Sequence, residues 1–154
     1  MKQIHVTLIE PPRFAFPLNH ASNVAIPPLG NAYIAASIEH AGHSVTVIDS
    51  IGLGLTEYIT YGSIYIRGIG IDKVLRIIDP STDLIAISNM FSCQWLITKD
   101  FINQIKHNFQ NVPIIIGGEP ISRDLLEKCL ILELDIFVTY GMTETCSGIA
   151  GFWI

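Results

Sequence analysis

Two apolar stretches decide the fold: DLIAISNM at residues 83–90 and IIIGG at residues 114–118. Neither alternates apolar with polar residues, a pattern that indicates strands buried on both faces of a parallel sheet. Both end on small residues. Parallel sheets bind ligands beyond the carboxyl ends of their strands, at the point where the strand order reverses. We therefore expect these two strand ends to lie side by side at a ligand-binding edge.

The rest of the chain alternates strand and helix patterns around these two segments. Further strands are expected at residues 4–9, 44–48 and 135–138, and helices at about 29–41, 71–78, 95–109 and 122–132. The glycine-rich stretch 51–65 and the proline-bounded stretch 11–28 are expected to be loops. Five strands alternating with helices predict one flavodoxin-like α/β domain over residues 1–154, with a doubly wound, parallel five-stranded sheet in the order 2-1-3-4-5.

Composition limits the kinds of partner. The 154 residues carry a net charge of −5, and their nine Lys and Arg are scattered rather than clustered, so we do not expect nucleic acid to bind. Apolar residues make up 49% of the chain and the mean hydropathy is +0.44, yet no uninterrupted apolar run reaches the ~18 residues that indicate a membrane span. We expect a ligand or a partner to cover part of this apolar surface.

The start of the chain and its cysteines favour the cytoplasm. Residues 1–3 lead straight into a strand pattern, with no secretory or lipidation motif. Cys93, Cys129 and Cys146 are too widely spaced for a disulfide framework or a CxxC-type metal site. We expect reduced thiols, no metal site formed by protein side chains, and a cytoplasmic protein.

The predicted topology brings several loops together at one edge of the sheet, because parallel strands end on the same side. These loops are rich in proline, glycine and small residues. The edge residues are Pro11, Pro12, Gly52, Gly54, Ser88, Asn89, Met90, Phe91, Gly117, Gly118, Glu119, Tyr140 and Gly141.

Each feature of this edge also has a purely structural explanation. A Gly-Gly pair after a strand occurs in many α/β proteins. Asp49, directly after a predicted strand, can cap a loop or a helix instead of meeting a ligand. Phe91 and Trp95 can belong to the core or can form the wall of a ligand site. Sequence alone leaves these alternatives open.

Over about residues 1–119 the sequence resembles the cobalamin-binding domain of cobalamin-dependent radical S-adenosylmethionine enzymes. The resemblance is carried by EPP (10–12), PPLGNAYIAASIEHAGHSVTVID (27–49), ISNMFS (87–92) and IIIGGE (114–119). Cobalamin domains of the methionine synthase type share D-x-H-x-x-G, S-x-L and G-G motifs. Here these motifs fall on residues 49–54, 88–90 and 117–118. The resemblance implies cobalamin as the cofactor.

One departure from the family pattern is informative. The cobalt-ligating histidine of the D-x-H-x-x-G motif falls on Ile51, which cannot coordinate a metal. The resemblance therefore implies a cofactor whose benzimidazole tail is displaced and whose cobalt has no histidine ligand. Glycines would allow the backbone to approach the tail closely. Ser88 would offer its hydroxyl to a ring nitrogen.

The last third, about residues 114–147, resembles adenylate-forming acyl-CoA ligases, in particular o-succinylbenzoate–CoA ligase. The likeness runs through GGEPIS (117–122), LLEK (125–128) and TYGMTET (139–145). It implies that Tyr140 would face an adenine, and that Thr143 and Glu144 would face phosphate and magnesium. The ligase family's glycine-rich phosphate loop and C-terminal lysine are not found in the 154 residues, so adenylation chemistry is not expected.

The sequence thus predicts a corrinoid-binding module that is not catalytic alone. Its expected partners are a corrinoid and either a radical S-adenosylmethionine domain or a separate partner protein, with neither nucleic acid nor a membrane. No radical cluster motif follows IIIGGE within the 154 residues. Two alternatives remain: a nucleotide-binding fragment of an acyl-CoA ligase over about residues 114–154, and a chimera, joined at IIIGG, that folds without a ligand.

Overall fold

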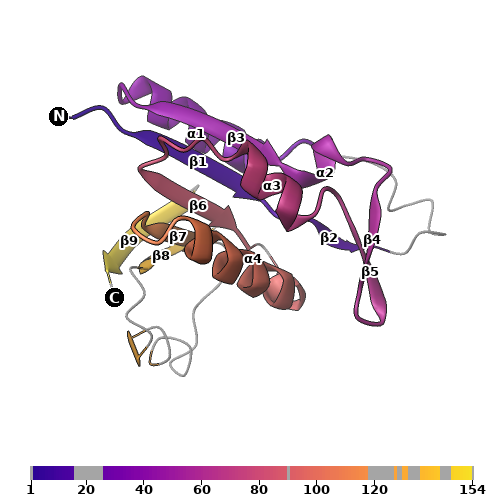
Figure 1. Cartoon of the computed structure of the whole chain (residues 1–154). Helices are drawn as coiled ribbons and strands as arrows, with labels where there is room; N and C mark the ends of the chain where they lie inside the picture. The colour runs from indigo at the N-terminus through magenta and orange to yellow at the C-terminus, as the bar shows by residue number, and fades with distance from the viewer. Residues whose placement is uncertain are drawn as a thin grey trace.

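The computed structural model describes residues 2–15, 26–89, 91–117, 127, 130–131, 136–142 and 147–153. A main sheet and a small sheet organise these residues (Figure 1). The main sheet contains β1 (His5–Glu10), β3 (Ser44–Asp49), β6 (Leu84–Ser88), β7 (Ile114–Gly117), β8 (Ile136–Met142) and β9 (Ser147–Trp153). Their spatial order is β3-β1-β6-β7-β8-β9.

The main sheet confirms the predicted strand order but not the predicted sheet. Strands β3, β1, β6 and β7 run parallel, with Ile9 of β1 beside both Ile48 and Ile87. Strand β8 follows β7 in parallel, and β9 pairs with β8 in the antiparallel direction. The expectation of a purely parallel sheet of five strands is therefore wrong. The chain turns back at β9 and makes the sheet mixed.

Helices cover both faces of the parallel strands. Helices α3 (Ile71–Ile77) and α4 (Trp95–Asn108) lie on one face, and α1 (Leu29–His40) lies along β3 and β1 on the other (Figure 1). Successive side chains of a strand point to opposite faces of the sheet, so neighbouring residues of β1 should meet different helices. Ile9 belongs to the core under α4, whereas its neighbour Glu10 reaches Asn31 of α1.

The core is made of branched apolar side chains from the strands and from one face of α4. Its α4 members follow helical spacing, which is why the predicted helix at about 95–109 is confirmed. The buried cluster comprises Ile9, Ile48, Ile66, Ile69, Val74, Ile78, Ile85, Ile87, Ile97, Phe101, Ile102, Ile105, Ile114 and Ile116.

Helix α1 has the predicted position but is shallowly packed. It ends before Gly42, whose positive φ of 86° suits the turn into β3. None of its residues is fully buried, and Leu29 and Tyr33, which contributed to the predicted helical pattern, are 64% and 76% exposed. Asn31, Ala35 and Ile38 are the half-buried positions nearer the sheet.

The small sheet lies where sequence reasoning expected loops. Strands β4 (Tyr58–Tyr61) and β5 (Ile64–Arg67) form a hairpin, and β2 (Arg13–Ala15) pairs antiparallel with β5. A short helix, α2 (Ser50–Leu53), precedes the hairpin. Figure 1 shows the small sheet beyond the carboxyl end of β1. It therefore stands beside the edge at which a ligand was expected.

Two other expectations concern the C-terminal third. Of the expected helix at 122–132, only Glu127, Leu130 and Ile131 are described, and they are helical. The expected strand break at Tyr140 is wrong, because β8 continues to Met142 with an irregularity in its pairing between Tyr140 and Gly141.

Candidate ligand-binding edge

The strand order reverses between β1 and β6. From β1 the chain passes to β3 on one side, and it then crosses to β6 on the other. Loops leaving β1 and β6 therefore diverge, and such a point is where open α/β sheets bind ligands. We use "candidate edge" for the residues at the ends of the three central strands: Glu10, Pro11, Pro12, Ser88, Asn89 and Gly117.

The predicted residues on these strands are brought together. Ser88 pairs with Gly117 across β6 and β7, and the Asn89 amide donates to the Gly117 carbonyl over 2.8 Å. Pro11 and Pro12 are buried, whereas Ser88 and Gly117 are half-buried. Met90, Gly118 and Glu119 lie outside the described residues.

Asn89 is held by a buried partner from α4. The Thr98 hydroxyl donates to Asn89 Oδ1 over 2.9 Å, and the two residues are 1% and 5% exposed. This bond fixes the turn that leads from β6 into α4. Of the two aromatic residues in question, Trp95 packs against the core, while Phe91 is 47% exposed at the strand end. Only Phe91 is left available as a wall for a ligand.

In the segment after β3, contacts within the protein account for Asp49, Gly52 and Gly54 without a ligand. Asp49 caps α2: its Oδ1 accepts from the amides of Ile51 and Gly52 over 3.0 and 2.9 Å. A Cβ on Gly52 would lie 2.5 Å from the Asp49 carboxylate, and one on Gly54 would lie 2.6 Å from the Ile69 nitrogen. Asp49 and both glycines therefore have structural roles, and half-buried Ile51 lies between Asp49 and Gly52 in α2.

A buried carboxylate at the switch point was missed by sequence reasoning. Glu10, the last residue of β1, is 5% exposed. Its Oε1 accepts from Nη2 and Nε of Arg13 over 2.5 and 3.2 Å, and its Oε2 accepts from Asn31 Nδ2 over 3.4 Å. An acidic residue that closes the apolar Leu8-Ile9 end of the strand was the available clue, since buried carboxylates require partners.

The small sheet is fastened to α4. The Tyr61 hydroxyl donates to the Asp100 carboxylate and also contacts the Leu96 carbonyl over 3.3 Å. The hydrogen bond to Asp100, together with desolvation and the negative charge of Asp100, raises the pKa of Tyr61 to about 12. The hairpin is thereby held next to the helix that begins at the candidate edge.

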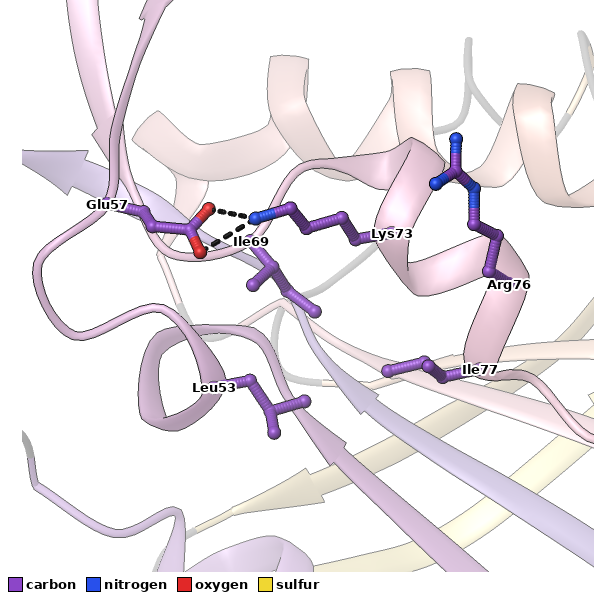
Figure 2. A pocket seen from close by; sticks show the side chains of 6 residues that line it. All are labelled: Leu53, Glu57, Ile69, Lys73, Arg76 and Ile77. Atoms are coloured by element: carbon purple, nitrogen blue, oxygen red, sulfur yellow. Dashed lines mark hydrogen bonds and ion pairs between the residues drawn. The ribbon is translucent and has the colours of Figure 1, made fainter.

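A shallow pocket of about 360 Å³ lies between the end of α2 and α3. Figure 2 shows the Lys73 ammonium directed at the Glu57 carboxylate, with an Nζ–Oε2 distance of 2.6 Å, while Arg76 points away from this pair. The pocket is lined by Leu53, Glu57, Ile69, Lys73, Arg76 and Ile77, and none of these residues belongs to the candidate edge.

The four described histidines lie away from the candidate edge. His5 begins β1 and His43 precedes β3, while His40 and His107 are in the last turns of α1 and α4. Because each of these helices leads into a parallel strand, all four are at the amino edge of the sheet. In the described part of the chain, no three His, Cys, Asp or Glu side chains form a group that could hold a metal ion.

The C-terminal candidates are described through their backbone. Tyr140 and Gly141 lie in β8, opposite Ala150 and Gly148 of β9. Thr143 and Glu144, which the ligase resemblance implicates in phosphate and magnesium binding, lie outside the described residues. Among the described helices, none is both long and apolar enough to cross a membrane.

Comparison with known proteins supports the fold rather than a family. No protein-family model matches the chain, and no curated protein sequence matches it. A cobalamin-binding protein from Desulfitobacterium hafniense DCB-2 has a similar structure, with a TM-score of 0.54 and 11% identity. That match covers 94% of this chain and 56% of the other protein.

O-succinylbenzoate coenzyme A synthetase (MenE) from Bacillus subtilis is also similar. Its unliganded form matches with a TM-score of 0.52 and 21% identity over 99% of this chain and 26% of the synthetase. Its complex with AMP matches with a TM-score of 0.49 and 21% identity, over 99% of this chain and 24% of that one. The chain thus spans little more than half of the first protein and about a quarter of the second.

Proposed function

We propose that this chain is a corrinoid-binding module that takes cobalamin at the candidate edge, with the benzimidazole tail displaced from the cobalt. The observation that carries the proposal is the reversal of strand order between β1 and β6, where open α/β sheets bind ligands. A cobalamin-binding protein with a similar fold gives the proposal its ligand. The sequence resemblance points to the same cofactor.

The residues of the candidate edge fit a bulky, neutral ring system. Gly117 and Ser88 present no large side chain, and buried Pro11 and Pro12 offer no backbone N–H that would need a partner. Ser88 would hydrogen-bond a nitrogen of the displaced tail, and half-exposed Phe91 would contact the corrin. Bound cobalamin supplies the cobalt chemistry. The chain binds and orients the cofactor.

The absence of a protein ligand to cobalt is part of the proposal. The four described histidines at the opposite edge of the sheet support it, and so does Ile51 at the family's ligand position. A partner that supplies the substrate, such as a radical S-adenosylmethionine domain, would complete the reaction.

Cobalamin binding can be tested directly. The purified protein is mixed with hydroxocobalamin, desalted and examined by absorption spectroscopy, with ATP and magnesium as a parallel arm. A corrin absorption band should remain with the protein. After reduction, the paramagnetic resonance spectrum of cob(II)alamin should lack the splitting from an axial nitrogen. Loss of all corrin colour on desalting, or a clear nitrogen splitting, would contradict the proposal.

A second candidate is a nucleotide-binding fragment of an acyl-CoA ligase. The similarity to MenE and the position of Tyr140 near the end of β8 favour it. Within the described residues, the glycines at 52 and 54 do not form a phosphate loop, because their amides already donate to Asp49 Oδ1 and to the Ile51 carbonyl. We therefore expect no magnesium-dependent ATP site, and a micromolar one found by calorimetry would put this candidate first.

A further inference from the structure

Glu10, Arg13 and Asn31 form a polar cluster at the end of β1, beside the residues proposed to take the cofactor. Arg13 directs two of its five N–H donors at Glu10 Oε1, which leaves three, and 33% of its side chain is exposed. Glu10 is in turn fixed by Asn31 of α1. The cluster therefore holds a guanidinium in one orientation at the end of β1, with part of its donor surface open.

A second cation lies beside the first. Arg67 of β5 is the direct cross-strand partner of Arg13 in the small sheet, so both side chains leave the sheet on the same face. Arg67 is 6% exposed, and its Nε donates to the Leu55 carbonyl over 2.7 Å. Like charges placed directly opposite each other destabilise a sheet. The Glu10 carboxylate, 2.5 Å from Arg13 Nη2, offsets part of that repulsion, and an anion at the exposed side of Arg13 would act in the same direction.

We infer that Arg13, oriented by Glu10 and flanked by Arg67, binds the phosphodiester of the cofactor's nucleotide tail; this rests on the proposed function. A guanidinium matches the geometry of phosphate oxygens. The phosphodiester is the anionic group that connects the corrin side chains to the benzimidazole. A tail entering between β1 and β6 would carry it past the end of β1, where Arg13 lies.

Comparing two corrinoids distinguishes phosphodiester binding by Arg13 from a general effect of Arg13 on corrinoid binding. Cobalamin contains the phosphodiester tail, whereas cobinamide lacks the nucleotide and its phosphate. The variant is Arg13→Ala, and Arg76→Ala is the control, because Arg76 is an arginine of α3 remote from the candidate edge. Circular dichroism and thermal unfolding check that each variant folds. Affinities for both corrinoids, and for AMP as a free phosphate-bearing ligand, are measured by calorimetry.

We expect Arg13→Ala to weaken cobalamin binding by about tenfold or more, because charge-assisted hydrogen bonds are among the strong ones, and to leave cobinamide binding unchanged. Arg13→Lys, which keeps the charge but not the fork, should lose less. Arg76→Ala should change neither affinity. Higher salt should weaken cobalamin binding to the wild type more than to Arg13→Ala.

Three results would overturn the inference. Equal loss of both corrinoids in Arg13→Ala would mean a structural role, and unchanged cobalamin affinity would mean no role. Loss of AMP binding with cobalamin binding intact would assign the guanidinium to a free nucleotide. If the wild type binds neither corrinoid, the proposed function itself fails, and the inference fails with it.

Discussion

The phenol of Tyr61 and the carboxylate of Asp100 join two parts of the molecule that are far apart in sequence. Tyr61 ends β4 in the small sheet, and Asp100 lies in the second turn of α4. Helix α4 also holds Asn89 through Thr98. The small sheet and the candidate edge are therefore attached to the same two turns of one helix.

Removing the Tyr61 hydroxyl should loosen the small sheet. We expect Tyr61→Phe to lower the free energy of unfolding by about 0.5–1.5 kcal/mol, the usual net contribution of a hydrogen bond. Urea denaturation measures the change. Tyr65→Phe, in the neighbouring strand and 46% exposed, is the matched control and should have little effect. Equal losses in both variants would mean that the Asp100 contact does not stabilise the fold.

The same contact predicts a pH dependence. The pKa of Tyr61 is raised from 10.0 to about 12 in the folded state, so folding favours the protonated phenol. This contribution is fully present below pH 10 and is lost as the pH rises through about 12. Ultraviolet titration of tyrosinate should show one tyrosine that ionises late and is missing from Tyr61→Phe. The stability of that variant should fall less steeply over this range.

Gly68 should not tolerate a side chain. Its φ is +123°, and a Cβ would lie 2.6 Å from the Ser50 carbonyl oxygen, which already accepts from the Ile69 amide. We expect Gly68→Ala to destabilise the protein by about 1–3 kcal/mol. Gly30→Ala is the control, because a Cβ there has open space within α1 and alanine favours helix. In thermal unfolding, the midpoint temperature of Gly68→Ala should be lower than that of the wild type. The midpoint of Gly30→Ala should be unchanged or higher.

The buried bond between Thr98 and Asn89 should matter for both stability and binding. Thr98→Val keeps the shape but leaves Asn89 Oδ1 without its donor, which we expect to cost about 1–3 kcal/mol. Because Asn89 belongs to the candidate edge, cobalamin affinity should fall as well. Thr60→Val, at an exposed position of β4, serves as the control. If Thr98→Val is clearly destabilised but keeps its affinity for cobalamin, Asn89 does not contribute to binding.

Gly117→Val tests the space at the end of β7. Two methyl groups at this half-buried position should obstruct the tail and reduce cobalamin binding severely, while stability changes by about 1–3 kcal/mol, the usual range for overpacking. Denaturation and calorimetry on the same preparation compare the two effects. Binding that falls only in proportion to folding would indicate that Gly117 is needed for the sheet rather than for the cofactor.

The parts of the fold that were predicted correctly are those whose sequence pattern is local. Strands β6 and β7 are continuous apolar runs, and α4 repeats apolar residues every fourth position. The small sheet escaped prediction because its strands have three or four residues, too few for a clear period, and because β2 joins β5 from far away in the sequence.

The candidate site was predicted in part for a similar reason. Small residues after strands, such as Ser88 and Gly117, are visible in a sequence once the strands are recognised. The importance of Glu10 depends on Arg13 and on Asn31, a residue of another element, and the cap made by Asp49 depends on local geometry. Polar contacts between elements are set by packing, and no periodicity reveals them.

The pairing of β2 with β5 also orders the events of folding. The β4–β5 hairpin can close locally within microseconds, but β2 can add to it only after the chain between Arg13 and Arg67 has been brought together. On a ribosome, the residues of the first strand would thus emerge long before the segment that completes their surroundings. We therefore expect the small sheet, which stands beside the candidate edge, to be completed late in the folding of this region.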